Sequence, residues 1–573
     1  MNILETVKLW AENPYFDTET RKEAKILLAE DKQTEREECF GSHLEFGTGG
    51  LRGIMGVGTN RINRYTIQTA TEGVARIIKK KAQESDATGV VIGYDSRHRS
   101  FEFAQVSSQV LAAHGIPVFL FREIAPTPLV SCELLRRKAI AGIIITASHN
   151  PPEYNGYKVY WENGGLIVPP EDSQIIEEVR NIKRIDEIPT VSFETALQKG
   201  IVEWIDKQAD EYFLDTVRKL SLGEREYNKK LGVVFTPLHG TGGRLVPELL
   251  LQQGFEKVKV VAEQMLPDGN FSTVASPNPE EKKSFAMAQA NASEDDELIL
   301  ANDPDADRLG VMVRNAEKNW QWLSGNQIGV LILDFVLSAL KLQHRLPQKG
   351  VIISTVVSSP LVSKMARGNG LNAVEVLTGF KWIRQAALRI EKEQGGKFVF
   401  GMEESHGFLM GNHSGDKDGI WASMAFAEMA AALKQNKLTP IDRLNQIYQQ
   451  YGVHLDALET QTFKGTKGIA KIQQIMRDLR NSPPVSVAGQ AVVKITDYLE
   501  NTIICGNETR QGPGLPQSNV IALELADNSR IIARPSGTEP KIKYYFNLHG
   551  KNSTLLQERL VEIQAEFLRD KST

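Results

Sequence analysis

The chain of 573 residues has few cysteines, and the three that it contains, Cys39, Cys132 and Cys505, lie far apart. An odd number of widely spaced cysteines excludes a disulfide framework and argues against a metal site made of thiolates. We therefore expect a protein of the reducing cytoplasm.

Long apolar segments and an excess of basic charge are also lacking. No uninterrupted run of about 18 apolar residues occurs, and the N-terminal segment carries acidic residues where a signal peptide would be basic. The 67 basic and 71 acidic side chains are interspersed and leave a net charge of −4, which is not the charge pattern of a nucleic-acid binder. We expect no membrane segment, no nucleic-acid partner, and small anions as ligands.

What the sequence does contain is a repeated order of apolar segments. A prior of about 150 residues per domain makes four domains the starting expectation. Three apolar segments, separated by room for one helix, recur three times before about residue 440, and this spacing is typical of parallel α/β units because a parallel crossover is long. The first segments begin near Val90, Val233 and Val351, the second near Val118, Val258 and Val374, and the third near Ile143, Leu298 and Phe398.

The two ends of the chain do not follow this pattern. Residues 1–45 predict two short helices, the second beginning at Asp17 or Thr18, that form a packing extension. The last segment predicts an amphipathic helix around 469–479, an antiparallel hairpin with a DNS turn, and a closing helix around 555–568. The predicted fold is α/β, with three similar domains of mixed, largely parallel sheets and a C-terminal α+β domain around a central cleft. We place the domains at 1–205, 206–322, 323–450 and 451–573.

The third apolar segment of the first repeat, near Ile143, is followed by a loop that reads TASHNPPEYNGYK. Ligands of parallel sheets bind at the carboxyl ends of strands, and this loop places Ser148 at such an end, before a Pro-Pro pair that forbids a helix. A lone serine there is more typical of a turn cap, but His149 and Lys158 nearby favour a rigidly held, reactive serine. The G-x-S-x-G motif is not present, so an α/β-hydrolase elbow is not indicated.

The second loop, NDPDADRLG, carries Asp303, Asp305 and Asp307 at alternate positions. We expect Pro304 to keep the backbone extended, so that alternate side chains converge on one side. Carboxylates that lie so close together repel one another unless a cation lies between them. Their oxygen atoms are suitable ligands for a Mg²⁺ ion that bridges to a phosphate. An EF-hand is excluded because Arg308 would occupy its required glycine position. A solvated acidic turn is the remaining alternative.

Two further loops carry polar groups. GMEESHGF contains Glu403 and Ser405, which suit the hydroxyl groups of a sugar, although a charged turn from strand to helix would look similar. RPSGTEPK, residues 534–541, combines a guanidinium, hydroxyls, a glycine and a lysine, and this set predicts a phosphate cradle rather than a simple hairpin end.

Glycine-rich and polar segments elsewhere are less specific. FGTGGLRG, residues 46–53, matches neither nucleotide-binding motif, but Arg52 is a candidate anion contact. GYDSR at 93–97, TPLHGTGG at 236–243 and TGFKW at 378–382 supply polar groups after strands, and each alone is more typical of a turn.

Taken together, FGTGGLRG, TASHNPPEYNGYK, DPDADRLG, EES and RPSGTEPK resemble the α-D-phosphohexomutase family, and they occur in the family's order along essentially the whole chain. The resemblance implies a phosphoserine enzyme that isomerises sugar phosphates. By motif matching, Ser148 would carry the phosphoryl group and would hold Mg²⁺ together with Asp303, Asp305 and Asp307. Glu403 and Ser405 would bind sugar hydroxyls, and the substrate phosphate that does not react would be held by Arg534, Ser536, Gly537 and Thr538.

The resemblance also implies a mechanism. Phosphoserine would donate to a sugar monophosphate, the resulting bisphosphate would turn around, and its other phosphate would return to serine. Candidate catalytic residues besides Ser148 are His149 and Lys158, either of which would move the hydroxyl proton, together with Arg52 and Lys417. Arg308 and Lys381 are further candidate substrate contacts.

The long N-terminal segment makes the chain most similar to the long phosphoglucomutase and phosphopentomutase branch of the family. A histidine that some members carry two residues after the loop serine is replaced here by Gly407, so a catalytic role for His406 is not expected. We predict conversion of glucose 1-phosphate to glucose 6-phosphate with glucose 1,6-bisphosphate as intermediate and activator. The alternatives are a phosphopentomutase or phosphomannomutase and, from different classes, a phosphatase, against which RPSGTEPK argues, or a catalytically silent sugar-phosphate-binding protein.

Overall fold

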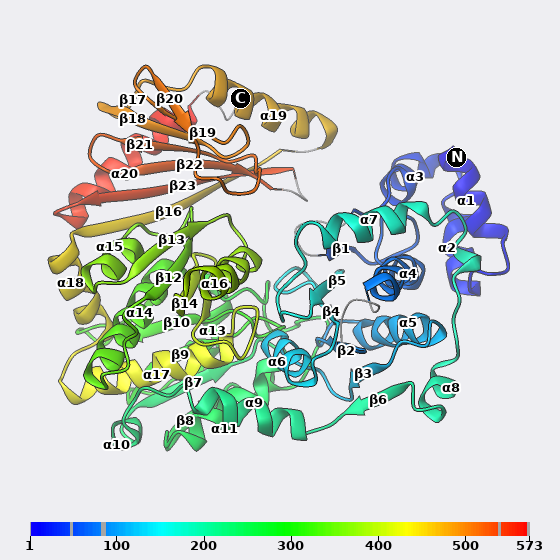
Figure 1. The fold of residues 1–573 in the computed structure, drawn as a ribbon, viewed down its shortest axis with the longest axis horizontal. Coiled ribbons are helices and arrows are strands. Elements are labelled where there is room, and N and C mark those ends of the chain that lie inside the picture. The colour runs from blue at the N-terminus through cyan, green and yellow to red at the C-terminus, as the bar shows by residue number, and fades with distance from the viewer. Residues whose placement is uncertain (1, 46–49, 82–86, 464, 537–539, 570–573) are drawn as a thin grey trace. The chain divides into compact units, whose positions relative to one another are not determined.

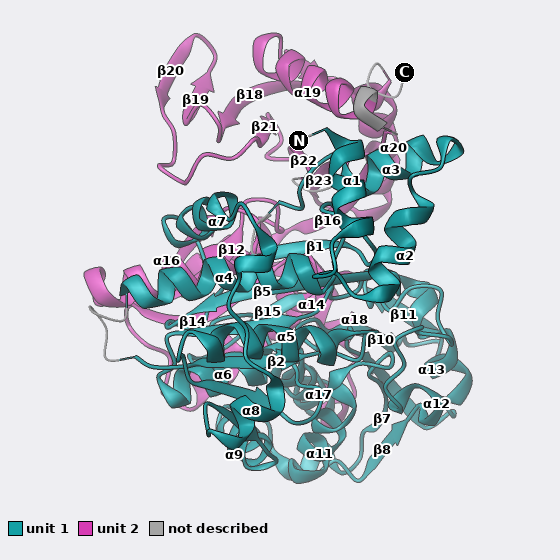
Figure 2. Cartoon of the chain, turned by 90° about the vertical axis from the view of Figure 1, so that its right-hand side faces the viewer, with its two compact units in different colours: residues 1–323, 407–432 teal, residues 324–406, 433–573 magenta. Residues whose placement is uncertain are grey.

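The structure is a computed structural model that describes residues 2–45, 50–81, 87–463, 465–536 and 540–569 (Figure 1). The chain forms two compact units, each made of two chain segments (Figure 2). Unit 1 comprises residues 1–323 and 407–432, and unit 2 comprises residues 324–406 and 433–573.

The first sheet of unit 1 has six strands in the order β1-β5-β4-β2-β3-β6. The strands β2, β3, β4 and β6 run parallel, whereas β5 and β1 are antiparallel to their neighbours. All residues of β2 and β4 are buried, because helices α5 and α6 pack against them, which explains their continuous apolar sequences. The bounds are β1 Gly50–Ile54, β2 Val90–Tyr94, β3 Val118–Phe121, β4 Ala141–Ile145, β5 Tyr154–Trp161 and β6 Val202–Ile205.

The second sheet of unit 1 has five strands in the order β11-β10-β9-β7-β8. Strands β8, β7 and β9 are parallel, and β10 and β11 continue the sheet in antiparallel fashion. The bounds are β7 Gly232–Thr236, β8 Lys257–Val260, β9 Asp296–Ala301, β10 Gly310–Arg314 and β11 Trp320–Leu323; the short strand β15 spans Gly407–Leu409.

The helices of unit 1 connect these strands. Helices α1 to α3 precede the first strand and enclose a small aromatic core in which Trp10 stacks on Phe16 at 4.5 Å between ring centroids. The bounds are α1 Ile3–Glu12, α2 Thr18–Ile26, α3 Gln33–Phe40, α4 Arg64–Lys81, α5 Ser100–Ala113, α6 Thr127–Arg137, α7 Glu171–Asn181, α8 Phe193–Gln198, α9 Gln208–Arg218, α10 Arg225–Asn228, α11 Leu245–Gln252, α12 Ala262–Met265, α13 Ala286–Asn291 and α17 Gly419–Gln435.

Unit 2 contains the third parallel set, in which β12 lies between β13 and β14. Its helices α15 and α16 pack against these strands, and α14 packs against β14 and α18. The bounds are β12 Gly350–Thr355, β13 Asn372–Val376, β14 Lys397–Glu403, α14 Gly325–Leu342, α15 Leu361–Gly368, α16 Phe380–Gln394 and α18 Pro440–Tyr451.

The C-terminal part of unit 2 is an antiparallel sheet in the order β16-β23-β22-β21-β18-β19-β20, with β17 paired to β18. One apolar core is shared by this sheet, α19 and α20. The bounds are β16 Val453–Thr462, α19 Gly465–Asn481, β17 Ser486–Val487, β18 Gln490–Asp497, β19 Thr502–Cys505, β20 Glu508–Gln511, β21 Ile521–Leu525, β22 Arg530–Pro535, β23 Lys541–Gly550 and α20 Ser553–Leu568.

The fold predicted from the sequence is confirmed in its main features. In each of the three repeats the first predicted strand lies between the second and the third, and all three are parallel. The hairpin with the DNS turn is the antiparallel pair β21–β22, and the helices α19 and α20 are present. The domain boundaries proposed from the sequence remain a prediction.

The N-terminal prediction of two helices is wrong, because the described part of residues 1–45 contains three. Asp17 caps α2 as expected, with its side chain accepting a hydrogen bond from the Thr20 amide. The additional helix α3, QTEREECF, has a polar sequence with little amphipathic pattern. Its buried residues are Arg36, Cys39 and Phe40. Tertiary packing therefore stabilises a helix that its own pattern does not announce.

Helix α14 tests the expectation that the chain has no membrane segment. Its 18 residues have a mean hydropathy of 1.4, so by length and composition it could cross a membrane. The helix is not an uninterrupted apolar run, which is why the sequence pattern does not predict it. In the structure 61% of these residues are buried inside the protein. A single helix of this kind is weak evidence for a membrane span, since core helices of other proteins have the same composition.

A buried carboxylate on α17 binds residues 221–223, which lie between α9 and α10 in unit 1. Glu428 accepts hydrogen bonds from Ser221 Oγ at 2.5 Å and from the amides of Leu222 and Gly223 at 3.0 Å each. Burial raises the pKa of Glu428, and these three hydrogen bonds act in the opposite direction.

We expect Glu428→Ala to lower the free energy of unfolding by about 2 to 4 kcal/mol, because three buried donors lose their acceptor. Glu428→Gln keeps an oxygen that can accept from the amides and should cost less than about 1.5 kcal/mol. Urea denaturation of the two variants and the wild type measures both values. Equal stability of Glu428→Ala and wild type would contradict this interpretation.

The raised pKa of Glu428 also gives the sign of a pH effect. A carboxyl whose folded-state pKa is raised contributes stability that is complete below the ordinary value of 4.5 and is lost as the pH rises through the folded-state value. Glutamine does not titrate. The Tm of the wild type relative to that of Glu428→Gln should therefore fall as the pH rises above 4.5. A Tm difference that stays constant with pH would contradict a raised pKa of Glu428.

Candidate active site

Two loops of unit 1 meet at the carboxyl ends of parallel strands. The loop after β4 carries Ser148, and the loop after β9 carries Asp303. Ser148 Oγ donates a hydrogen bond to Asp303 Oδ2 at 2.7 Å, and both side chains are buried. The pair joins residues 155 positions apart in the chain, and each follows the carboxyl end of a parallel strand in its own sheet, β4 in the first and β9 in the second.

Ser148 is held in an unusual backbone conformation. Its φ of 52° lies in the left-handed region, which is unfavourable for a side chain with a Cβ. The Ser148 amide donates to Thr146 Oγ1 at 2.8 Å, and Ser148 Oγ lies 3.2 Å from His149 Nδ1. The loop thus aims the serine hydroxyl between a carboxylate and an imidazole.

The three aspartates converge, but not by the route that the sequence suggested. Their loop is not extended; it is a tight turn in which Ala306 has a φ of 51° and its amide donates to the Asp303 carbonyl at 2.8 Å. The prediction that Pro304 keeps the backbone extended is therefore wrong. The turn nevertheless brings one carboxylate oxygen from each aspartate within 4.8 Å of the others, with all three side chains buried.

This cluster fits a divalent cation. Asp305 Oδ1 and Asp307 Oδ1 are buried and accept no hydrogen bond from any residue that the structure describes. Buried carboxylate oxygens without donors are costly unless a positive charge lies close to them. Hard oxygen ligands in this number, with further positions left for phosphate or water, are those that Mg²⁺ prefers.

Two lysines approach the same carboxylates. Lys158, on β5, lies 2.8 Å from Asp305 Oδ2 and 3.6 Å from Asp307 Oδ2 through its Nζ. Lys417, in the segment before α17, lies 3.0 Å from Asp307 Oδ2. A third contact fastens this segment, since Asp416 accepts a hydrogen bond from Tyr160 of β5 at 2.8 Å. Both lysines that the sequence predicted as candidate catalytic residues are thus at the cluster.

The electrostatics of the cluster differ from one aspartate to the next. Burial, together with the charges of Asp305 and Asp307, raises the pKa of Asp303 well above its ordinary value. Burial acts in the same direction on Asp305, but the charge and hydrogen bond of Lys158, together with Asp303 and the charge of Lys417, outweigh it and lower the pKa of that carboxyl. For Lys158, burial lowers the pKa, whereas Asp305 and Asp307 outweigh this and raise it. Lys158 is therefore a cationic partner of the aspartates.

Two arginines and a histidine complete the charged surroundings. Arg52, on β1, donates to Asn150 Oδ1 at 3.2 Å, and Arg308 lies 3.7 Å from Asp303 Oδ2 and pairs with Glu280. Burial, and then the positive charges of Arg308 and Arg52, lower the pKa of His149 well below its ordinary value. A neutral imidazole beside Ser148 can accept a proton.

The remaining predicted site residues lie in unit 2. Glu403 ends β14, and burial, followed by the charge of Glu403, raises the pKa of the adjacent Glu404, which accepts a hydrogen bond from Thr355 at 2.9 Å. The Arg534 guanidinium, at the end of β22, acts against this shift in the pKa of Glu404. The two predicted loops of unit 2 are thus electrostatically coupled. Of the other predicted residues in this unit, Ser405 follows β14, Lys381 is buried in the first turn of α16 and Ser536 follows β22.

Gly537 and Thr538, and also residues 46–49 of FGTGGLRG, lie outside the described residues. The interpretation of Gly537 and Thr538 as phosphate contacts remains a prediction.

Sequence reasoning missed the residues that support the aspartate turn. Thr127, the first residue of α6, donates from Oγ1 to Asp305 Oδ2 at 3.1 Å and from its amide to the Asp305 carbonyl at 2.9 Å. Thr241, in the segment TPLHGTGG, donates from Oγ1 to the Pro304 carbonyl at 3.0 Å. Both threonines lie in segments that follow parallel strands, and this position is the sequence feature that could have identified them.

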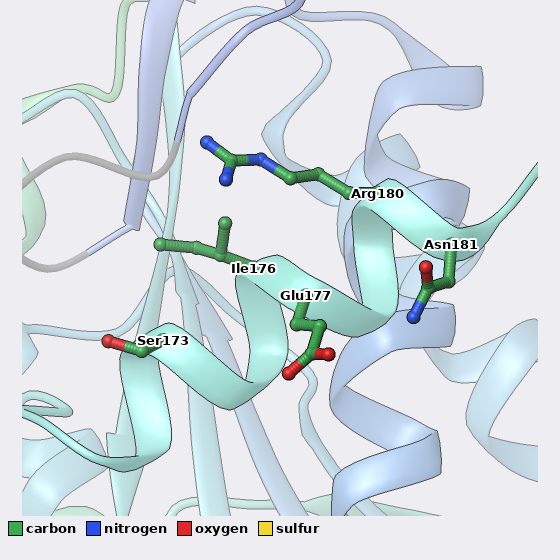
Figure 3. A pocket seen from close by; sticks show the side chains of 5 residues that line it. All are labelled: Ser173, Ile176, Glu177, Arg180 and Asn181. Atoms are coloured by element: carbon green, nitrogen blue, oxygen red, sulfur yellow. The ribbon is translucent and has the colours of Figure 1, made fainter.

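A hollow of about 500 Å³ lies over α7 and is unrelated to this cluster (Figure 3). Its lining comes from one face of that helix and includes no residue of the serine or aspartate loops. The lining residues are Ser173, Ile176, Glu177, Arg180 and Asn181.

Known protein families match most of the chain. Three family models match in order: phosphoglucomutase/phosphomannomutase α/β/α domain I at residues 43–186, domain II at 210–317 and domain III at 324–451. The phosphoglucomutase of Staphylococcus aureus strain MSSA476 is 39% identical over 535 residues, which are 92% of this chain and 94% of that protein.

Solved structures show the same fold. A putative phosphomannomutase from Thermus thermophilus has a TM-score of 0.67 at 20% identity. The match covers 93% of this chain and 100% of the Thermus chain. The Paramecium parafusin, a phosphoglucomutase in its open form, has a TM-score of 0.69 at 18% identity and covers 92% of this chain and 96% of its own. The chain belongs to the phosphoglucomutase/phosphomannomutase family and is an isomerase of the phosphohexomutase class.

Proposed function

We propose that this protein is a phosphoglucomutase that interconverts glucose 1-phosphate and glucose 6-phosphate through a phosphoserine at Ser148 and a glucose 1,6-bisphosphate intermediate. The observation that carries the proposal is the contact of 2.7 Å between Ser148 Oγ and the aspartate cluster at Asp303. The similarity to the Staphylococcus aureus phosphoglucomutase supports the choice of sugar. Sugar phosphates as partners and a cytoplasmic location belong to the same proposal.

In this proposal Asp303, Asp305 and Asp307 hold Mg²⁺ together with the phosphoryl group on Ser148. The bound ion would supply positive charge that stabilises the transferred phosphoryl group. Lys158 and Lys417 lie at the same carboxylates and add two further positive charges. Arg52 is held toward the serine loop through Asn150 and is positioned to contact the same group.

Each transfer moves one phosphoryl group and one proton. In the forward step the P–O bond to Ser148 breaks, a bond to the free sugar hydroxyl forms, and the hydroxyl proton passes to a base. In the return step the other sugar P–O bond of the bisphosphate breaks, the phosphoryl group bonds to Ser148 Oγ, and the sugar oxygen that leaves takes up a proton. His149 Nδ1, at 3.2 Å from Ser148 Oγ, is placed to accept the proton of the serine hydroxyl. Lys158 is the other candidate to move the sugar proton; as a cation beside Asp305 it would give a proton to the leaving sugar oxygen.

The recognition residues serve the part of the substrate that does not react. Arg534, Ser536, Gly537 and Thr538 would hold the second phosphate by charge-assisted and backbone hydrogen bonds. Glu403 and Ser405 would bind sugar hydroxyls, and Lys381 and Arg308 are the additional contacts in this proposal. Because a mutase uses its bisphosphate in two orientations, these groups must accept both.

The alternatives differ in substrate or in class. Phosphomannomutase or phosphopentomutase activity would use the same serine and aspartates, and a solved neighbour carries the name of putative phosphomannomutase. A catalytically silent sugar-phosphate-binding protein has no need of a serine hydroxyl on a buried carboxylate cluster, and the assembled Ser148–Asp303 pair argues against it.

We expect the purified protein to carry one phosphate on Ser148, and we expect Ser148→Ala to lower kcat/KM by about a thousandfold or more, because the covalent acceptor is lost. Intact-mass and peptide analysis locate the phosphate. Ser173→Ala, an exposed serine on α7, is the matched control and should keep wild-type activity. Full activity of Ser148→Ala would rule out the phosphoserine mechanism.

Removal of divalent cations should abolish turnover, and added Mg²⁺ should restore it. Asp305→Asn should lower kcat by about a hundredfold or more in saturating Mg²⁺, because a charged ligand is lost while the volume is kept. Asp215→Asn, which removes a surface charge on α9, is the control. A fully active Asp305→Asn variant in buffer with chelator would show that the aspartates hold no functional metal.

The sugar is tested with a panel of glucose, mannose, glucosamine and ribose 1-phosphates, each with a trace of its own bisphosphate. We expect the highest kcat/KM for glucose 1-phosphate, by about tenfold or more over the others, since a hydroxyl-binding loop discriminates among sugars through its hydrogen bonds. Preference for ribose 1-phosphate would instead identify a phosphopentomutase, and preference for mannose 1-phosphate a phosphomannomutase.

A further inference from the structure

The turn after β2 places one arginine beneath the serine loop. Arg97 Nη2 donates to the carbonyl oxygen of Ser148 at 2.6 Å and to that of Asn150. Its Nη1 donates to the carbonyl oxygens of Pro151 at 2.7 Å and Tyr154 at 3.0 Å. A single guanidinium therefore binds four carbonyl groups of the segment from Ser148 to Tyr154, the first residue of β5.

Arg97 is itself held from several sides. Its side chain is buried, its amide donates to Asp95 Oδ1 at 3.0 Å, and its Nε lies 3.3 Å from Asp95 Oδ2. The guanidinium also lies over the Phe271 ring, 4.9 Å from the centroid. Burial lowers the pKa of Arg97, and the Asp95 carboxylate acts against this shift. The planar group is thus a rigid support.

The serine loop needs such a support. Residues 147–153, all of which the structure describes, belong to no helix or strand. Two of them, Pro151 and Pro152, cannot donate backbone hydrogen bonds. Ser148 has a left-handed φ of 52°, a strained conformation that persists only where the surroundings enforce it. Carbonyl groups in such a loop must find donors from elsewhere, and Arg97 supplies them.

We propose that Arg97 is a positioning residue that fixes the Ser148 loop so that the serine oxygen stays aligned for phosphoryl transfer. The inference rests on the proposed function. Arg97 touches only backbone carbonyls of the loop in these contacts, so it acts through Ser148 rather than on the substrate. The GYDSR segment, which looks like a simple turn in the sequence, acquires a role in catalysis.

Arg97→Lys tests this inference, because lysine keeps the charge but cannot reproduce the planar fork with its fixed donor directions. A misplacement of a reacting atom by about 1 Å can cost about a hundredfold in rate. We therefore expect kcat to fall about ten- to a hundredfold in both reaction directions, while KM changes less than about threefold. Hydrogen exchange of the peptide covering residues 146–154 should become faster in the same variant.

Arg36→Lys is the matched control. Arg36 is also a buried arginine of unit 1 that binds backbone carbonyls, those of Leu27 at 2.8 Å and Ala29 at 3.2 Å, but it lies in the N-terminal helices. Its substitution should lower the Tm without changing kcat or the exchange of residues 146–154. Asp95→Asn is the second variant, to be used if Arg97→Lys does not fold, and it should change kcat and exchange in the same direction.

The measurements separate this inference from the proposed function. An unphosphorylated, inactive wild-type protein would overturn the proposed function, and the exchange experiment would still test whether Arg97 fixes the loop. If the wild type turns over and Arg97→Lys keeps its kcat, Arg97 is only a stabilising residue and the inference is overturned. A loss of kcat with unchanged exchange of residues 146–154 would overturn it as well.

Discussion

The carboxylates of Asp303, Asp305 and Asp307 lie within 4.8 Å of one another in a buried turn, so their mutual repulsion must be offset by positive charge. The organisation of unit 1 follows from this requirement. Strand β5 brings Lys158 to two of the three carboxylates, and the segment before α17 brings Lys417 to one of the same two, that of Asp307. Oxygens that these cations leave without a donor match the ligands of a divalent metal, and the serine hydroxyl joins the same cluster.

The parallel sheets make this concentration of charge possible. Loops at the carboxyl ends of neighbouring strands lie side by side, so that groups far apart in the chain meet without long connections. The support is distributed over the same sheet edges. Thr127 binds Asp305 from the start of α6, Thr241 binds the Pro304 carbonyl from the loop after β7, and Arg97 binds the serine loop from the turn after β2. Reactive groups in strained turns are thereby held by donors from rigid elements.

The two compact units differ in the chemistry that they carry. Unit 1 contains the serine, the aspartates and the lysines that would handle the transferred phosphoryl group. Unit 2 contains the loops with Glu403 and Arg534, which would bind the sugar and the second phosphate and are electrostatically coupled through the pKa of Glu404.

The sequence by itself determined the strands of the three repeats and the identity of most candidate site residues. The first and third strands of each repeat are buried almost throughout and therefore have continuous apolar sequences, and the reactive loops follow the third strands directly, so both leave a local pattern. It did not determine α3, whose stability comes from packing, or the shape of the aspartate turn, which depends on the left-handed Ala306. Only the tertiary structure decided that Ser148 binds Asp303, that Lys417 reaches Asp307 and that Arg97 supports the serine loop. These contacts join segments far apart in the chain, and no local sequence pattern encodes which of them meet, since the loops of Ser148 and Asp303 follow strands of different sheets.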